Sequence, residues 1–214
     1  MSRDLSFGHV IKGGREEFAD HKAVASGPFE HGKPWHVLWK KDGESNYYMD
    51  IIILRGNLYI SGDLGEAVYC WGGKVTPAFL LQCSFDYFWG KCEASENGRH
   101  AVQWSEQAAE AWLKDRWEDV AEEFADDLKM QAIAKELFDD LRNVAHSKFE
   151  WQALLIENQG TRDDPVAKVL GEDAYCESGI WDAGEVPMAR CILHWQGMRM
   201  AFRQLGYGEK KEAA

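Results

Sequence analysis

The sequence predicts an α+β fold, with an N-terminal antiparallel β-meander followed by a mainly helical C-terminal half. Residues 47–71, YYMDIIILRGNLYISGDLGEAVYCW, are the only strongly β-like block, rich in β-branched and aromatic residues. After residue 104, apolar residues recur every three or four positions, which is the period of an amphipathic helix. We therefore expect a β-rich region with short helices over residues 1–100 and a helical region over 101–214, with one domain overall as the alternative.

Turn signals divide the β-like block into strands. Arg55-Gly56-Asn57 predicts a short turn, because Gly and Asn tolerate a positive φ. The first strand of the resulting hairpin is nearly all apolar, which is typical of a strand covered on both faces. The expected meander has three or four antiparallel strands, at Trp35–Trp39, Tyr47–Leu54, Leu58–Ser61 and Ala67–Trp71.

Capping residues mark the expected helix starts. Thr76 precedes a proline at the first helical position, and Ser84 or Asp86 opens an aromatic segment that ends at Cys92. Ser105 opens the helical half, whose apolar face predicts either one very long helix or two helices joined near Asp126-Asp127. Residues Glu16–Ala19 allow a short helix at best. Further helical segments are expected at Trp151–Ile156, after Asp163-Asp164-Pro165, and from Val186-Pro187 to Leu205.

The composition argues against several classes of protein. With 45% hydrophobic residues and 13% aromatic residues, the chain is neither disordered nor of low complexity. The net charge of −12 argues against direct nucleic-acid binding, because phosphate backbones favour clustered Lys and Arg. No apolar run is long enough for a membrane helix and residues 1–4 begin no secretory signal, so we expect no membrane association and a location in the host cell cytoplasm. The five cysteines have no metal-site or redox spacing and are expected to be reduced.

Standard catalytic and cofactor signatures are missing from the sequence. The Gly62-Asp63-Leu64-Gly65 segment follows a strand but lacks the helix start of a phosphate site, so we interpret it as a sharp reversal in which Asp63 bonds its own turn. His31 and His36 could meet Asp50 or Asp63 across strands and hold a metal through imidazole and carboxylate groups. However, no two histidines have the spacing of a ligand pair. We therefore expect no catalytic residue, no metal and no cofactor.

The most distinctive feature of the sequence is acidic. Between Trp104 and Arg142 the chain has twelve acids and five bases, a formal charge of −7. Like charges four residues apart on a helix each cost about 0.2–0.5 kcal/mol, so such a helix gives up stability for its charge. We interpret this surface as one that attracts a basic protein partner, with a merely solubilising face and a divalent-cation site as alternatives. Seven carboxylates form two adjacent rows on one side of the predicted helix: Asp115, Asp119, Glu123 and Asp127 in the first, and Glu118, Glu122 and Asp126 in the second.

Part of the chain resembles a set of uncharacterised bacteriophage and prophage accessory proteins. Their pattern is an Ile-Ser-Gly-Asp-x-Gly core, then a β-strand, then a Tyr-Phe segment near a Lys-Cys pair; here these features lie at Ile60–Gly65, Ala67–Trp71 and Tyr87–Cys92. The resemblance extends over residues 35–100 and carries no catalytic residue. It implies a phage accessory protein of the kind that acts on host machinery or host defence.

The acidic surface and the resemblance together lead us to expect a non-enzymatic, phage-encoded inhibitor. Its expected partner is a basic protein surface of a host defence complex, such as a CRISPR effector. One alternative is a small phage hydrolase or nucleotide-modifying enzyme that uses His36, Asp50 or Asp63 around the Gly62–Gly65 turn. The other alternative is a phage structural or assembly factor.

Overall fold

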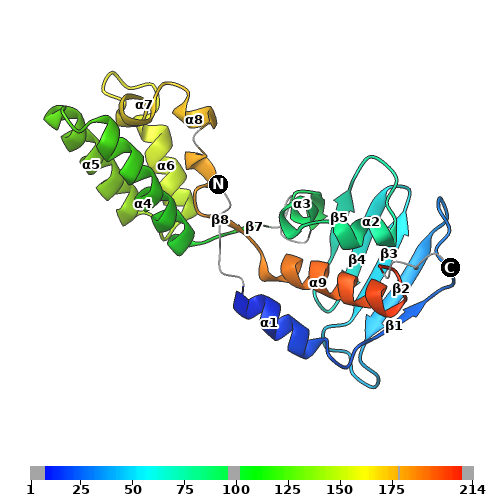
Figure 1. The fold of residues 1–214 in the computed structure, drawn as a ribbon. Helices are drawn as coiled ribbons and strands as arrows, with labels where there is room; N and C mark the ends of the chain where they lie inside the picture. The colour runs from blue at the N-terminus through cyan, green and yellow to red at the C-terminus, as the bar shows by residue number, and fades with distance from the viewer. Residues whose placement is uncertain (1–7, 96–101, 178, 209–214) are drawn as a thin grey trace. The chain divides into compact units, whose positions relative to one another are not determined.

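The computed structural model describes residues 8–95, 102–177 and 179–208, which form two compact units (Figure 1). The sheet unit combines the chain up to residue 102 with the chain from residue 187 onward, and the helical unit comprises residues 103–186. The helical unit is thus an insertion between two parts of the sheet unit. The expected α+β fold, with an N-terminal antiparallel sheet and a mainly helical C-terminal half, is confirmed.

The sheet unit is built on a six-stranded meander. Each strand pairs antiparallel with the next along the chain, in the order β1-β2-β3-β4-β5-β6. The four expected strands are present, and the structure adds a strand at each edge of the sheet. The strands are β1 (Lys22–Ala25), β2 (Trp35–Lys40), β3 (Met49–Leu54), β4 (Asn57–Gly62), β5 (Ala67–Cys70) and β6 (Cys92–Ser95).

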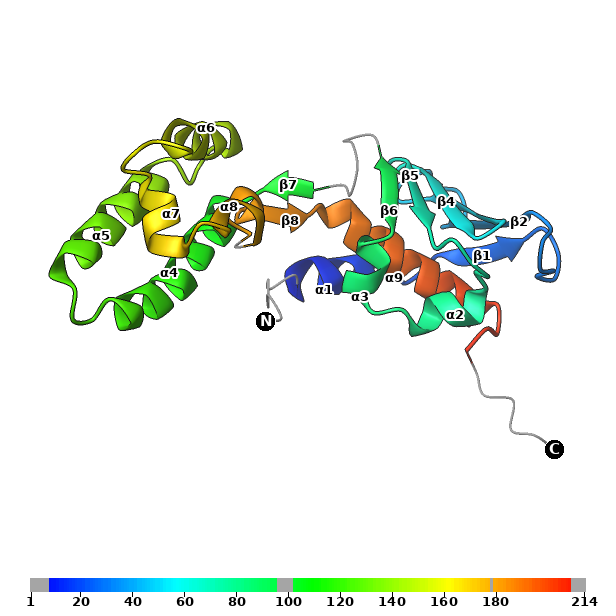
Figure 2. The same cartoon turned by 90° about the horizontal axis from the view of Figure 1, so that it is seen from above.

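One face of this sheet packs against helices. The C-terminal helix α9 (Ala189–Gln204) contacts β1, β2 and β3, and the three shorter helices of the unit pack against α9. Figure 2 shows all four helices on the same side of the strands. Trp39, Met49 and Ile51 point into the core between the sheet and the helices, where each is almost completely buried. The shorter helices are α1 (Gly8–Glu17), α2 (Pro77–Gln82) and α3 (Phe85–Trp89).

The opposite face of the sheet is only half covered. Asp50, Ile52 and Leu54 alternate with the buried residues of β3 and are partly exposed. The prediction that this strand is covered on both faces is therefore wrong. In the structure Ile52 lies between His36 of β2 and Tyr59 of β4 in register, so the side chains of neighbouring strands partly shield one another.

The helix starts follow the predicted capping chemistry. The side chains of Thr76, Ser84 and Ser105 each accept a hydrogen bond from a backbone N–H three residues ahead, at 3.1, 3.3 and 3.2 Å. The expected helix around Glu16–Ala19 is longer and earlier than predicted, because α1 spans Gly8–Glu17. The aromatic segment after Ser84 leaves the helix at Trp89, and Cys92 begins β6.

The helical unit contains two long helices where one or two were expected. Asp127 separates α4 from α5, because its carboxylate accepts hydrogen bonds from the backbone N–H groups of Lys129 and Met130 at 3.1 and 3.0 Å. The unit's helices are α4 (Glu106–Glu123), α5 (Leu128–Asn143), α6 (Lys148–Asn158), α7 (Pro165–Leu170) and α8 (Ala174–Glu177), with a 3₁₀ turn at Ile180–Asp182.

One buried and one partly buried tryptophan hold the helical unit together. The Trp151 indole is fully buried and donates to the carbonyl of Ile180 at 2.7 Å. Trp104 donates to the carbonyl of Ala145, also at 2.7 Å. Both bonds satisfy the indole N–H while its ring fills the core. Trp104 ends β7 (Val102–Trp104), which pairs with β8 (Glu185–Pro187) where the chain enters and leaves this unit.

The C-terminal helix differs from its prediction in two respects. It begins at Ala189, because Val186 and Pro187 belong to β8. It also packs with the sheet unit, whereas the sequence-based division grouped all of residues 101–214 as one helical region. Across the part of the chain that the structure describes, no helix has the length and apolarity needed to cross a membrane.

Candidate functional site

Charge is divided very unevenly between the two units. The helical unit holds 21 of the 36 acids but only eight of the 24 Lys and Arg residues, which gives it a formal charge of −13. The sheet unit holds the other 15 acids and 16 bases, a formal charge of +1. The whole excess of negative charge therefore belongs to the helical unit. This total is larger than the −7 of residues 104–142, because the chain from 143 to 186 adds nine acids and three bases.

The acidic side chains of α4 lie outside its packed face. Leu113 and Val120 are buried against the rest of the helical unit. Asp115, Glu118 and Glu122 lie two or five residues from these positions, on the side of the helix away from the packed face, and Asp119 and Glu123 lie between that side and the packed face. All seven carboxylates of the predicted site are exposed: Asp115, Glu118, Asp119, Glu122, Glu123, Asp126 and Asp127. We call the first five of these, which belong to α4, the acidic face.

The sequence suggested that both rows of carboxylates lie on a single helix, but the structure places them on α4 and on the connection that follows it. The helix α4 ends at Glu123, and Asp126 and Asp127 belong to the connection to α5. The Asp127 carboxylate is occupied as the N-cap of α5. The chain turns here because a capping aspartate competes with continuation of the preceding helix. Glu123 and Asp127 are therefore four residues apart in the sequence but do not share one helix face.

Most of the acidic face is not neutralised by neighbouring cations. Within the described residues, Asp119 has an ion pair, with Arg116 at 3.2 Å, whereas Asp115, Glu118, Glu122 and Glu123 have none. The chain does neutralise acids elsewhere in the same unit. On α5, Asp139 accepts hydrogen bonds from Lys135 at 2.7 Å and Arg142 at 2.9 Å, and the Lys135 bond lowers the pKa of that carboxyl.

The position of these acids on α4 costs helix stability. Asp115 with Asp119, Asp119 with Glu123, and Glu118 with Glu122 are like-charge pairs at i, i+4, each unfavourable by about 0.2–0.5 kcal/mol. Glu122 and Glu123 also lie in the last turn, where the helix dipole favours cations, and no base is present there. Solubility alone would not require acids at the unfavourable end of a helix.

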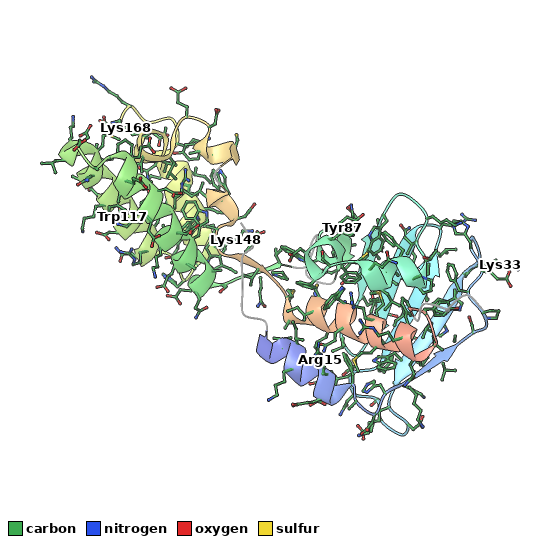
Figure 3. All side chains as sticks on the ribbon, in the orientation of Figure 1. Arg15, Lys33, Tyr87, Trp117, Lys148 and Lys168 are labelled. Carbon is green, nitrogen blue, oxygen red and sulfur yellow. The ribbon has the colours of Figure 1, made fainter. Side chains whose placement is uncertain are left out.

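A hollow lies along α5 in the same unit and includes Asp127, the residue before that helix. It has a volume of about 640 Å³ and is formed by α5, α7 and the segments that precede α5 and α7. Leu128, which lies between the lining residues Asp127 and Lys129 in the sequence, has a side chain that is 79% exposed. Lys168, labelled in Figure 3, lies at this hollow and pairs with Asp163 at 2.8 Å. The apolar residues of the hollow are Met130, Ile133, Leu137 and Pro165, and its acids are Asp127, Glu136, Asp140 and Asp163.

The sequence pattern did not reveal this hollow. Its residues come from three segments separated by up to about forty positions, so only the packing of α7 against α5 brings them together. Among the described residues, no group of three or more His, Cys, Asp or Glu side chains has the geometry of a metal site.

Asp63 has a structural partner in the sheet unit. Its carboxylate accepts a hydrogen bond from the backbone N–H of Tyr47 at 2.8 Å, and its own N–H donates to the carbonyl of Tyr48 at 3.2 Å. The expectation that the Asp63 side chain bonds its own turn is wrong. Its carboxylate instead joins that turn to the β2–β3 connection. Tyr47, whose N–H donates this bond, has a φ of 58°, a conformation that few residues with a Cβ adopt.

His36 and Asp50 do meet across strands. Their Nε2 and Oδ1 atoms lie 2.6 Å apart on the half-exposed face of the sheet. Asp50 lies on β3, between His36 on β2 and its register partner Ser61 on β4. In a Ser-His-Asp triad the imidazole occupies that middle position. His31 lies apart from this pair, in the connection between β1 and β2.

The chain was compared with protein-family models, curated proteins and solved structures, and nothing matches in any of the three comparisons.

Proposed function

We propose that this protein is a non-enzymatic binding protein whose helical unit presents its acidic face to a basic surface of a protein partner. The observation that supports the proposal best is the division of charge, −13 on the helical unit against +1 on the sheet unit. Charge that served solubility alone would be useful on both units. Concentrated on one unit, it produces a field that draws in and orients a cationic partner.

The hollow along α5, in the same unit as the acidic face, gives the proposed interface a point of attachment. Lys and Arg have apolar stems and charged ends, and they bury the stem while the end stays near water or a counter-charge. The wall formed by Ile133 and Leu137 suits such a stem, and the nearby carboxylates of Glu136 and Asp140 suit its charge. Under this proposal the partner inserts a basic side chain here, and the acidic face steers its approach.

The partner class follows from the resemblance of residues 35–100 to phage accessory proteins. We propose a host defence complex as the partner, with a CRISPR effector as the leading example, because nucleic-acid-binding channels are basic. Occupying such a channel with carboxylates would block it without any chemical step.

The experiment is a capture of partners with matched charge variants. The wild-type chain, the double variant Asp115→Lys/Glu123→Lys and the control Glu157→Lys/Glu172→Lys are immobilised and exposed to host lysate. The bound proteins are then identified by mass spectrometry. Both variants make the same change in net charge, and all four positions are exposed acids of the helical unit without an ion-pair partner in the described chain. Only the first variant alters the acidic face.

The proposal predicts a host protein with a basic surface that is captured by the wild type and the control and lost with the Asp115→Lys/Glu123→Lys variant. Loss with both variants would indicate a response to net charge alone, and retention with both would indicate a solubilising face. Either of these two outcomes contradicts the proposal.

A further inference from the structure

A second surface, in the sheet unit, has the opposite charge. In a meander, every second connection lies at the same end of the sheet. The β1–β2 connection, the β3–β4 turn and the segment after β5 therefore meet at one end. The contact is close, because the backbone N–H of Trp71 donates to the carbonyl of Gly56 at 3.2 Å. A Cβ added to Gly56 would lie 2.5 Å from the carbonyl oxygen of Gly73.

These three segments enclose a small basic pocket. It has a volume of about 160 Å³ and is lined by His31, Lys33, Arg55 and Lys74 together with small and apolar residues, and no Asp or Glu of the described chain lines it. Lys33, labelled in Figure 3, forms an ion pair with Glu30 at the edge of the β1–β2 connection. The sheet unit as a whole has 16 bases and 15 acids, so four basic side chains around one hollow are a local concentration of positive charge.

Arg55 occupies this pocket in an unfavourable backbone conformation. Arg55 and Gly56 form the two-residue turn between β3 and β4, with φ values of 48° and 84°. Turns with positive φ at both positions favour Asn or Gly at the first, because a Cβ is disfavoured in the left-handed region. Strained residues of this kind concentrate at ligand-binding positions. Asn here would satisfy the turn better, but only Arg supplies a guanidinium with donors for oxyanion oxygens.

We propose that this pocket binds a phosphoryl group, in inorganic phosphate or in a phosphate monoester. The volume is below the roughly 300–1,000 Å³ of pockets for whole drug-sized ligands, so a single tetrahedral oxyanion fits better than a complete cofactor. Arg55 binds two of its oxygens, and Lys33 and Lys74 supply further positive charge. Phe29 lies at the same pocket and offers a ring for the organic part of a monoester. This site lies in the sheet unit and does not depend on the acidic face.

The test follows backbone amide signals by NMR during titration with sodium phosphate, with sodium chloride at matched ionic strength as the reference. A second titration uses adenosine monophosphate. Three chains are compared: the wild type, Arg55→Asn and Arg15→Gln. Arg15, labelled in Figure 3, is exposed on α1. The Arg15→Gln substitution therefore removes the same charge from the same unit, but outside the pocket.

We expect saturable shifts at Gly56, Gly73 and Lys74 with phosphate in the wild type and in Arg15→Gln. The Arg55→Asn variant should bind at least about tenfold more weakly, as loss of a charge-assisted hydrogen bond implies. Its thermal midpoint should nevertheless rise, because Asn tolerates the left-handed turn. This opposite response separates lost binding from lost folding. If adenosine monophosphate binds more tightly than inorganic phosphate, and Phe29→Leu reduces that difference, the phosphoryl group belongs to a nucleotide. If the two ligands bind equally, the ligand is inorganic phosphate.

Two results would overturn this inference. In the first, phosphate causes no larger shifts than chloride does. In the second, the Arg55→Asn and Arg15→Gln variants weaken phosphate binding equally, as expected for an unspecific cationic surface.

Discussion

The phenolic oxygen of Tyr69 and the Nδ1 atom of His194 lie 3.1 Å apart, and both side chains are completely buried in the sheet unit. The other imidazole nitrogen, Nε2, lies 3.1 Å from the carbonyl oxygen of Leu64. A carbonyl only accepts, so Nε2 carries the proton and Nδ1 accepts from the Tyr69 hydroxyl. Burial lowers the pKa of His194 to about 4, so the imidazole is neutral at pH 7. This pair links β5 to α9 under the turn that contains Asp63.

His194 should make the protein less stable in mild acid. Its pKa is lowered on folding from 6.5 to about 4, so the unfolded state takes up the proton first as the pH falls. Stability is therefore complete above pH 6.5 and falls progressively towards pH 4, by a total of about 3 kcal/mol from this residue. The measurement is urea unfolding at pH 7.5 and pH 4.5 for the wild type and for His194→Gln. We expect a smaller pH effect in the variant, and parallel pH profiles for the two chains would refute this role for His194.

Two turn glycines should respond differently to the same substitution. Gly56 and Gly43 have φ values of 84° and 78°, so Ala at either position takes up the same unfavourable backbone conformation, at a cost of about 1–2 kcal/mol. Only at Gly56 does the new methyl group meet a backbone oxygen, that of Gly73 at 2.5 Å; at Gly43 nothing lies within 4 Å. Gly56→Ala should therefore cost about 1–3 kcal/mol more than Gly43→Ala in urea unfolding. Equal losses would mean that the segment after β5 moves away freely.

Asp63 should contribute to stability and not to partner binding. Asp63→Ala removes the acceptor for the Tyr47 N–H and should lower the free energy of unfolding by about 1 kcal/mol. Asp63→Asn keeps a carbonyl oxygen and should lose less. Urea unfolding measures both effects, and partner capture should be unchanged in both variants. If Asp63→Ala abolished biological activity while folding and partner binding stayed intact, a catalytic role for this turn would replace the binding proposal.

The sequence predicted those elements whose signals are local. Thr76, Ser84 and Ser105 cap helices with their own side chains, and the paired apolar runs of β3 and β4 are joined by a short turn. The edge strands β1 and β6 escaped prediction, because each has four residues and depends on its longer neighbour for pairing. The turn at Arg55 was located correctly, but its positive φ values fall on Arg55 and Gly56, with Asn57 already in β4.

The candidate sites were predictable only in part. The carboxylates of α4 were found from their spacing, because a helix makes i+4 residues neighbours without help from the rest of the fold. The break at Asp127 depended on a cap that competes with helix continuation, and the hollow at Ile133 depended on the packing of α7. The basic pocket at Arg55 collects residues from three connections, so no single stretch of sequence displays it.

The acidic face should also lower the free energy of unfolding measurably. Asp115→Lys/Glu123→Lys converts two repulsive pairs with Asp119 into attractive ones and places a cation in the last turn of α4. We expect the free energy of unfolding to rise by about 0.5–1.5 kcal/mol in urea titrations. The control Glu157→Lys/Glu172→Lys changes the net charge equally and should leave stability within about 0.5 kcal/mol of the wild type. A loss of stability in the first variant would show that the acids of α4 are structurally favourable.

The most direct test of the central claim is the association rate of the captured partner, measured by surface plasmon resonance between 50 and 300 mM salt. Steering by the acidic face acts on the on-rate and is screened over about 10 Å at 0.1 M salt. The account predicts a wild-type on-rate that falls steeply with salt, and an Asp115→Lys/Glu123→Lys variant that binds at least about tenfold more slowly with little salt dependence. The Glu157→Lys/Glu172→Lys control should behave nearly as the wild type. If the more stable α4 variant bound with the same on-rate and the same salt dependence as the wild type, the acidic face would be only a solvated surface, and the proposed function would be wrong.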